Sequence, residues 1–247
     1  MDFDFPEKQQ INSRLELPMH IRWKLSTLEN YTEDKYLYGR EWYRNQLSSL
    51  GIEINGPVLD AGCGPGQWAI VMAEANSEFP VVALDTNKEL LSAANFQKSK
   101  LGLENLQIKQ GEIYKLPFED ESFSLTCCIG VLQLVRVREA FSELVRVTKP
   151  GGQILINVSG LGFYLTNIIG SAKSCKKEIM RQNYRFIKNT LRGGNNDPFT
   201  YFTKSRIERI GKEFNLRVRS IEATGLYPPQ KKTFLGAGVN WYATFFK

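Results

Sequence analysis

The chain has 247 residues, of which 42% are hydrophobic and 23% charged, and its formal net charge is +6. This length and balance are typical of a globular protein with one α/β domain and some additions, large enough to bury a full core. No apolar run approaches the ~18 residues of a membrane span. The first ten residues, MDFDFPEKQQ, are acidic and lack the apolar centre of a secretory signal. We therefore expect a cytoplasmic protein with no membrane partner.

The four cysteines and the single histidine limit the covalent and metal chemistry. The cysteines show no C-x-x-C spacing, which favours reduced thiols in a cytosolic protein. Cys127 and Cys128 fall in an apolar strand and are expected in the core. With one histidine and no His/Cys cluster, we expect no metal site.

Residues 1–50 carry helical patterning without a glycine-rich turn. Within them, Arg40 to Leu50 is expected to form a helix that stops at Gly51. We interpret residues 1–50 as an N-terminal helical cap.

The most informative segment is VLDAGCGPG, from Val58 to Gly66. The residues before it, from Pro57, predict a short buried strand, and Gln67 to Ala73 after it predict a helix. A strand, a glycine turn and a helix let a ligand lie against bare backbone at the mouth of a parallel sheet. Glycine is required because a β-carbon would hold the ligand away and disfavour positive φ.

The same segment argues against the common phosphate-bearing ligands. Its spacing is G-x-G-x-G instead of the G-x-G-x-x-G of dinucleotide sites, and no Lys-Ser/Thr follows as in a P-loop. The acid inside the motif, Asp60, would repel a phosphate. The segment therefore indicates a nucleoside ligand that lacks phosphates and carries a cation.

Beyond the turn, apolar strands alternate with helices. Strands are expected to start near residues 58, 81, 106, 123 and 153, and helices are expected over 67–76, 87–101 and 136–148. Strand–helix alternation with short turns predicts a doubly wound parallel sheet.

Residues 163–192 interrupt this alternation and are predicted to form one helix, ended by the segment GGNNDP at 193–198. At about 100° per residue, one side of this helix is apolar and most basic residues lie on another; the apolar side consists of Ile168, Ala172, Cys175, Ile179 and Phe186. Lys173 to Arg192 holds seven of the 32 basic residues and one of the 26 acidic residues. The other 25 basic and 25 acidic residues cancel, so this segment carries the whole excess charge.

The C-terminal residues are expected to complete the sheet. Thr203 to Phe214 predicts a helix with Thr203 or Ser205 near its cap. Leu216 to Ile221 and Trp241 to Phe246 predict two closing strands.

Four segments in register resemble the motifs of class I S-adenosylmethionine-dependent methyltransferases, in the small-molecule, quinone-type branch. They cover roughly residues 56–158 in the family's order: VLDAGCGPG at 58–66, VVALD at 81–85, QGEI with the following LPF and SF at 110–123, and LVRVTKPGG at 144–152. The resemblance implies a Rossmann-like, seven-stranded sheet whose last strand inserts antiparallel between strands five and six. It divides the chain into a cap at 1–50, a cofactor-binding core at 51–160, a helical lid at 161–200 and a C-terminal completion of the sheet at 201–247.

The resemblance implies S-adenosylmethionine as the cofactor and assigns its contacts. Asp60 would face the methionine ammonium, and the turn that holds Gly62, Cys63, Gly64 and Gly66 would let the backbone approach. Asp85, with Thr86 beside it, would hold the two ribose hydroxyls through its two oxygens. Since Asp85 precedes a helix, it could instead cap that helix.

The adenine contacts follow from the same resemblance. Glu112 stands where the family usually has aspartate, accepting from the adenine amino group, and the amide of Ile113 would donate to the ring. The carbonyl of Ile129, after the fourth strand, would accept from the methionine ammonium. Arg40 is a further candidate, as a partner of the cofactor carboxylate.

The sequence does not identify a catalytic base. Methyl transfer from a sulfonium can be accelerated largely by positioning, and a base is needed only if the acceptor must lose its proton. The candidates are Gln133, at a position that is often histidine in relatives, and the cap residues His20 and Tyr38. Aromatic rings attract cations, so the cap's aromatic residues could also wall the sulfonium; these are Tyr31, Tyr36, Tyr38 and Trp42.

The function predicted is methyl transfer to an oxygen or nitrogen atom of a small molecule, and the basic helix makes an anionic acceptor one option. Nucleic-acid methylase signatures are mostly missing, since there is no N/D-P-P-Y/F tetrad and no Pro-Cys pair. The alternative is an RNA or ribonucleoprotein methyltransferase that uses the basic residues 173–192 to bind phosphates. A third hypothesis is that the chain is a non-catalytic subunit, which binds the cofactor and supports another subunit.

Overall fold

The computed structural model describes residues 33–173, 177–193, 198–224, 233–234 and 237–247. The first described element is helix α3, Glu33–Ser49. The helix predicted from Arg40 is confirmed and begins earlier than expected. It ends where expected, because Gly51 adopts a φ of +60° that continues no right-handed helix.

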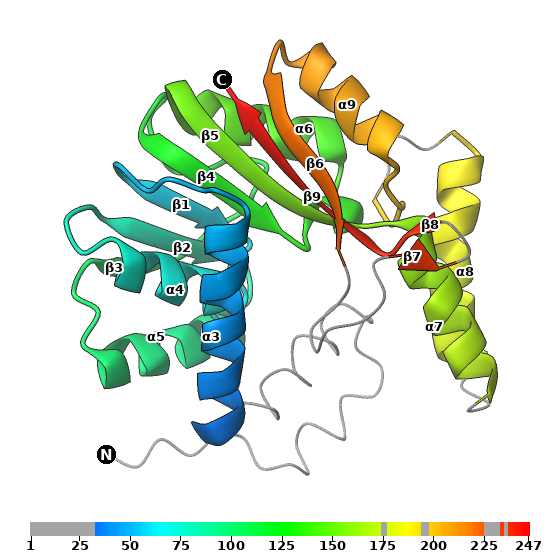
Figure 1. Ribbon diagram of the computed structural model, residues 1–247, viewed down its shortest axis with the longest axis horizontal. Helices are drawn as coiled ribbons and strands as arrows, with labels where there is room; N and C mark the ends of the chain where they lie inside the picture. The colour runs from blue at the N-terminus through cyan, green and yellow to red at the C-terminus, as the bar shows by residue number, and fades with distance from the viewer. Residues whose placement is uncertain (1–32, 174–176, 194–197, 225–232, 235–236) are drawn as a thin grey trace.

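Seven strands form one sheet in the order β3-β2-β1-β4-β5-β9-β6 (Figure 1). The five strands predicted first are confirmed and parallel to one another, and β5 begins earlier than predicted: β1 Val58–Ala61, β2 Val81–Asp85, β3 Leu106–Gln110, β4 Phe123–Ile129 and β5 Thr148–Ser159. The connecting helices are also confirmed: α4 Gln67–Ala75, α5 Lys88–Leu101 and α6 Val137–Val147. The doubly wound, Rossmann-like sheet predicted from the alternation is therefore present.

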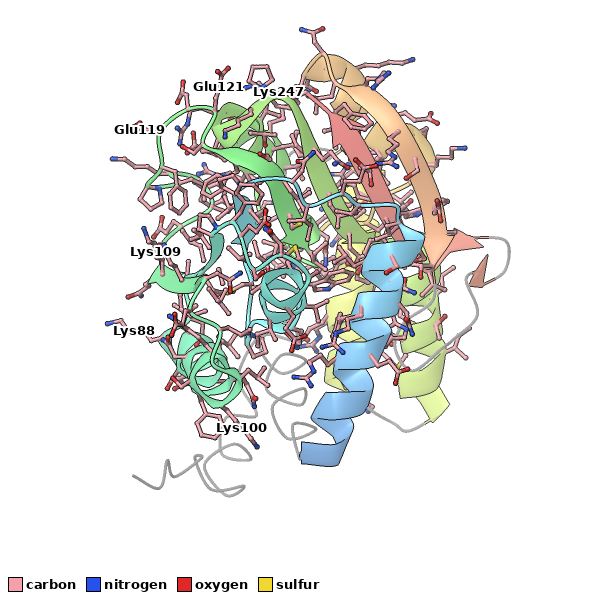
Figure 2. The ribbon with its side chains drawn as sticks, turned by 60° about the vertical axis from the view of Figure 1, so that its left-hand side comes forward. Lys88, Lys100, Lys109, Glu119, Glu121 and Lys247 are labelled. Atoms are coloured by element: carbon pink, nitrogen blue, oxygen red, sulfur yellow. The ribbon has the colours of Figure 1, made fainter. Side chains whose placement is uncertain are left out.

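The two closing strands complete the sheet as the resemblance implied. β9, Asn240–Phe246, lies between β5 and β6, Arg217–Thr224, and is antiparallel to both. The last residue, Lys247, is tied to the start of β5, since its Nζ donates to the Thr148 carbonyl at 2.8 Å and lies 3.5 Å from the Glu121 carboxylate (Figure 2). The C-terminal strand β9 thus lies beside β5, the longest strand of the sheet.

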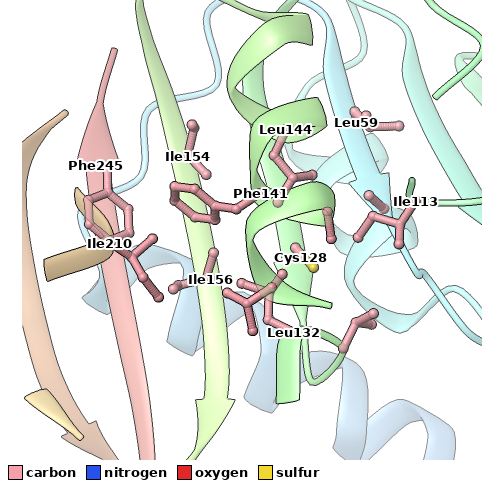
Figure 3. Close-up of a cluster of buried hydrophobic side chains, with 14 of the residues drawn as sticks. Leu59, Ile113, Cys128, Leu132, Phe141, Leu144, Ile154, Ile156, Ile210 and Phe245 are labelled. Carbon is pink, nitrogen blue, oxygen red and sulfur yellow. The ribbon is translucent and has the colours of Figure 1, made fainter. Parts of the chain in front are cut away.

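Alternate residues of each strand feed two apolar layers, one on either face of the sheet. On one face α6 and α9, Lys204–Glu213, pack against residues such as Leu59, Ile154 and Phe245 (Figure 3). On the other face α3, α4 and α5 pack against Val58, Leu125 and their neighbours. Since strand side chains alternate, the adjacent Cys127 and Cys128 enter opposite layers, and both are fully buried as expected.

The segment predicted as one helix over residues 163–192 forms two, so that prediction is wrong. Helix α7 spans Leu161–Lys173 and helix α8 spans Lys177–Leu191, and the two pack side by side (Figure 1). A single helical wheel assumes that the axis continues, whereas here each helix buries aromatic side chains against the other. Local periodicity could not predict this reversal because both halves favour helix.

Stacked aromatic rings hold the two helices together. Tyr164 of α7 stacks on Phe186 of α8 with ring centroids 4.5 Å apart, and Phe186 contacts Phe199 edge-on at 5.6 Å. Both Tyr164 and Phe186 are buried. We call this pair of helices the α7–α8 hairpin. Burial raises the pKa of the Tyr164 phenol well above its ordinary value, so this group stays neutral at physiological pH.

The chain returns from the α7–α8 hairpin to the sheet through α9. Thr203 caps this helix by accepting from the Arg206 amide at 3.2 Å, which confirms the first of the two caps predicted. A short antiparallel pair, β7 Thr233–Phe234 and β8 Ala237–Gly238, contacts α7. Within the part of the chain that the structure describes, no helix is both long enough and apolar enough to cross a bilayer.

The stacking of Tyr164 on Phe186 leads to a prediction for the stability of the α7–α8 hairpin. We expect Phe186→Ala to destabilise the α7–α8 hairpin by about 3–5 kcal/mol, because a buried ring and its stacking partner are lost. Amide hydrogen exchange should rise in α7 and α8 and change little in β1, β4 and β5. Tyr184→Ala on the same helix is the control, since that ring is exposed. Unchanged exchange in Phe186→Ala would contradict this account.

Candidate functional site

The glycine turn after β1 adopts the backbone that its sequence predicted. Gly62, Gly64 and Gly66 have φ values of +82°, +56° and +87°, a region that side chains other than glycine rarely occupy. A β-carbon at Gly62 would overlap the side chain of Val131, which follows β4. The turn is therefore packed against the end of β4 at Gly62, where there is no room for a side chain.

The amides of this turn donate within the protein. Those of Gly62 and Cys63 donate to the Leu84 carbonyl at 2.7 and 3.0 Å, and that of Gly66 donates to the Cys63 carbonyl at 3.1 Å. The Gly64 amide donates to Oδ2 of Asp85 at 2.9 Å. A phosphate-binding loop directs such amides at its ligand. This turn uses them to join β1 to β2, in agreement with a ligand that carries no phosphate.

Asp60 lies in β1 with only 1% of its surface exposed. It is paired in the sheet with Cys127 of β4. Burial, followed by the charges of Asp60 and Cys128, raises the pKa of the Cys127 thiol well above its usual range. Cys127 is therefore a neutral core residue, and its thiol contacts the Met72 sulfur at 3.6 Å.

Asp85 ends β2 and is 6% exposed. Its Oδ2 accepts from Gly64 and its Oδ1 from the Asn87 amide, both at 2.9 Å. A carboxylate has two acceptor oxygens, which matches in number the two ribose hydroxyls that Asp85 is predicted to hold. The helix-cap alternative for Asp85 is wrong, because Asn87 caps α5 by accepting from the amides of Glu89 and Leu90 at 2.9 and 3.1 Å. Thr86 beside it is exposed.

The segment after β3 lies next to the same strand end. The Gly111 amide donates to the Asp85 carbonyl at 3.1 Å, and a β-carbon at Gly111 would meet Leu84 at 2.8 Å. Glu112 follows with an exposed side chain, and Ile113 is buried in the apolar layer (Figure 3). The two residues predicted to contact adenine therefore follow the end of β3, next to the end of β2 that holds Asp85.

The end of β4 completes this edge of the sheet. Ile129 is half-buried, and Gly130 after it has a φ of +71° and donates to the Asn157 carbonyl at 2.8 Å. Gln133 follows in a short 3-10 helix, Leu132–Leu134, and is 7% exposed. Its Oε1 is buried without a hydrogen-bond partner among the residues described here. A buried carbonyl of this kind is costly unless a ligand uses it.

Comparison with known proteins agrees with this geometry. A methyltransferase domain model matches residues 52–213, which is more than half of the chain. The chain belongs to the class I S-adenosylmethionine-dependent methyltransferases. A solved S-adenosylmethionine-dependent methyltransferase from Methanosarcina mazei superposes on 81% of this chain and 96% of its own, with a TM-score of 0.58 and 17% identity. Another, from Aquifex aeolicus, covers 82% of this chain and 88% of its own at a TM-score of 0.54 and 17% identity. At such identities these structures support the fold.

A curated relative agrees with the family at the level of sequence. The demethylmenaquinone methyltransferase of Oceanobacillus iheyensis is 30% identical over 118 residues, 47% of this chain. The chain spans about half the length of the curated relatives it matches. The fold class, the family and the cofactor class predicted from the sequence are confirmed.

The described part of the methyltransferase cap is α3, which is joined to the core by an ion pair. Arg40 pairs with Glu74 of α4 at 3.0 Å, which fixes α3 on the core. Trp42 contacts Tyr43 edge-on at 5.0 Å. His20 and Tyr31 lie outside the described residues, and the side chains of Tyr36 and Tyr38 are likewise outside them. The roles of Arg40, His20 and Tyr38 therefore stay predictions.

Two arginines of this methyltransferase form hydrogen-bond networks that were not predicted from the sequence. One is Arg206, which is buried, donates to the Thr200 hydroxyl at 2.9 Å and the Tyr201 carbonyl at 2.6 Å, and lies 4.1 Å from the Phe202 ring. Burial lowers its pKa to about 10, so it is still cationic at neutral pH. The Thr200 amide in turn donates to the Gln133 carbonyl at 3.1 Å. This network joins the segment before α9 to the end of β4.

The other arginine is Arg146 of α6, which clamps the segment after β3. Its guanidinium donates to the carbonyls of Leu116 and Phe118 at 3.0 and 2.8 Å, and to Glu143 and Asp120 at 2.7 and 2.8 Å. Glu143 also accepts from the Leu116 amide at 2.8 Å. The hydrogen bond from Arg146 holds the pKa of Glu143 below its usual value. Local pattern did not mark this arginine, because the two carbonyls and Asp120 that it contacts are distant in sequence.

This clamp makes a prediction for stability. We expect Arg146→Ala to lower the free energy of unfolding by about 1–3 kcal/mol, since two loop carbonyls and two carboxylates lose their donor. Arg138→Ala on the same helix, which breaks an exposed pair with Glu213, should cost at most about 1 kcal/mol. Urea unfolding of both variants measures the difference, and equal losses would contradict the clamp.

The clamp also predicts a dependence on pH. The folded-state pKa of Glu143 is lowered, so its stabilisation is complete above the unfolded value of about 4.3 and is lost as pH falls through the folded value. Arg146→Ala removes the cause of that shift. We therefore expect the stability difference between wild type and Arg146→Ala to shrink on acidification from pH 7 to about 3, as measured by urea unfolding. A constant difference over this range would contradict the assignment.

Proposed function

We propose that this methyltransferase binds S-adenosylmethionine at the glycine turn and transfers its methyl group to an oxygen or nitrogen atom of a small molecule. The observation that carries the proposal is the buried Asp85 carboxylate at the end of β2, hydrogen-bonded to the glycine turn through one oxygen and to Asn87 through the other. A bound sulfonium supplies an electrophilic methyl group. The residues of this chain would bind and orient the two reactants.

The proposed cofactor contacts are those predicted from the resemblance. Asp85 and Thr86 would hold the ribose, and Glu112 with the Ile113 amide would hold adenine. Asp60 and the Ile129 carbonyl would face the methionine ammonium, beside the backbone of the turn; its residues are Gly62, Cys63, Gly64 and Gly66. The support is their common location, since all follow or end β1, β2, β3 or β4 at one edge of the sheet.

For the acceptor we propose Gln133 as a contact. Its Oε1 is buried without a hydrogen-bond partner in the described part of the chain, and it follows the strand end that carries Ile129. Such a carbonyl would accept from an acceptor N–H or O–H and orient the atom to be methylated. The relatives named for demethylmenaquinone favour a small-molecule acceptor. They give no support to the RNA alternative.

Calorimetry tests the cofactor half of the proposal. We expect Asp85→Ala to weaken binding of S-adenosylmethionine and of its demethylated product by about 10- to 100-fold, because a charged hydrogen-bond acceptor is worth about 1.5–3 kcal/mol. Glu119→Ala removes an equal charge from an exposed loop and should bind as wild type (Figure 2). The cofactor site is wrong if wild type does not bind, or if Asp85→Ala binds equally well.

A second variant tests the acceptor half. Gln133→Met keeps the side-chain length and removes the buried carbonyl, so the free energy of unfolding should stay equal or rise by about 1 kcal/mol. Methyl transfer, assayed on a panel of phenols, quinols and amines, should fall at least about tenfold at unchanged cofactor affinity. Lower stability at wild-type activity would assign Gln133 to the core.

A further inference from the structure

Helix α8 carries an exposed surface of mixed apolar and basic character. Three of the four large hydrophobic side chains that are exposed in the described chain lie on the α7–α8 hairpin: Ile169, Tyr184 and Leu191. Tyr184 is 59% exposed and Leu191 is 73% exposed, more than any other large hydrophobic side chain described. Soluble proteins seldom leave such residues together on one helix face without a partner.

The spacing along α8 places these two side chains among cations. Residues 177, 181, 184, 188 and 191 follow at intervals of four, three, four and three, so they form one stripe along the helix. The five residues are Lys177, Arg181, Tyr184, Lys188 and Leu191, and all of them are exposed. Arg185 and Arg192, also exposed, flank this stripe. We call these seven residues the α8 stripe.

The opposite side of α8 is committed to packing within the protein. Asn183 and Phe186 are buried there, and Phe186 stacks on Tyr164 of α7. The α8 stripe therefore faces outward along a helix of 15 residues, about 22 Å long. The hairpin itself stands at one edge of the molecule, far from α5 (Figure 1). A flat, extended partner can reach this edge without touching the cofactor site.

The charge of the α8 stripe and its exposed apolar side chains together indicate the kind of partner that it binds. The stripe holds five basic residues, and residues 161–193 contain one acid, Glu178. Five cations in this arrangement would bind either a nucleic acid or an anionic lipid surface. Phosphate binding needs no exposed leucine, whereas a leucine and a tyrosine beside cations are what enters the headgroup region of a bilayer.

We propose that the α8 stripe is a docking surface for an anionic lipid membrane. Lys and Arg side chains contact lipid phosphates, and Tyr184 and Leu191 insert between the headgroups. The contact lies parallel to the membrane plane and needs no spanning segment, so it revises the expectation of no membrane partner. The proposal goes beyond methyl transfer and does not rest on it.

Cosedimentation with vesicles tests the proposal. The full chain is mixed with vesicles of equimolar phosphatidylglycerol and phosphatidylcholine, or of phosphatidylcholine alone. We expect binding to the anionic vesicles only, weakening as salt rises from about 0.1 to about 1 M and the Debye length falls from ~10 to ~3 Å. Absence of binding to the anionic vesicles, or equal binding to both, would overturn the proposal.

Two variants assign the binding to the stripe. Lys188→Glu with Arg192→Glu should weaken vesicle binding about tenfold or more. The matched control is Lys88→Glu with Lys204→Glu, which removes the same charge from the first residues of α5 and α9 (Figure 2 shows Lys88). Equal weakening by both pairs would reduce the effect to net charge and overturn the assignment. Circular dichroism and cofactor calorimetry on the same samples confirm folding and keep this outcome separate from that of the proposed function.

Leu191→Ser decides between lipid and nucleic acid. It leaves every cation in place, so it should weaken vesicle binding about three- to tenfold while changing the affinity for a mixed-sequence single-stranded RNA little. A wild-type preference for the RNA, with vesicle binding unchanged in Leu191→Ser, would identify a nucleic-acid surface and overturn the membrane proposal.

Discussion

The hydrogen bonds between the glycine turn and the end of β2 are the constraint on which the candidate site depends. The Leu84 carbonyl accepts from the amides of Gly62 and Cys63, and the Asp85 carboxylate accepts from that of Gly64. These bonds set the distance between the turn and the acid. They also consume the amides that a phosphate site would use, so the turn offers bare backbone and a carboxylate in place of an anion site.

The segments that identified the family are contacts of one another in the fold. Val131, after β4, lies where a β-carbon at Gly62 would be, so the first and fourth strand ends limit each other's side chains. Arg146, within the motif that precedes β5, clamps the Leu116–Phe118 segment that follows β3. Motifs separated by some 30 residues are thus joined by direct hydrogen bonds, which explains why they occur together.

The α7–α8 hairpin is attached to this core by aromatic packing and by a hydrogen bond. Tyr164 and Phe186 form a buried cluster with Tyr201, against which Leu134 packs, and the Tyr201 amide donates to the Thr190 hydroxyl at 2.9 Å. The hairpin therefore adjoins the segment after β4 where the acceptor is proposed to bind, while the basic residues of the α8 stripe are exposed. Its inner side serves packing and its outer side remains available for a partner.

Much of the fold was determined by the sequence alone, because local signals decide it. The glycine positions with positive φ, the five parallel strands and the cap at Thr203 each follow from residues close in the chain. The same holds for the acids at the ends of β1 and β2, since a carboxylate that follows apolar strand residues is unusual without a role. The antiparallel last strand came from the resemblance, since local pattern does not set strand order.

Only the tertiary structure decided the rest, because it depends on contacts between distant residues. Both halves of residues 161–191 favour helix, so the break between α7 and α8 follows from the stacking of Tyr164 on Phe186. Arg146 and Arg206 look like ordinary basic residues of amphipathic helices until the fold brings carbonyls to their guanidinium groups. The excess charge of residues 173–192 was evident from the sequence. That the basic residues of the α8 stripe lie on the side of α8 opposite the packed face, beside exposed Tyr184 and Leu191, was set by which face the protein buries.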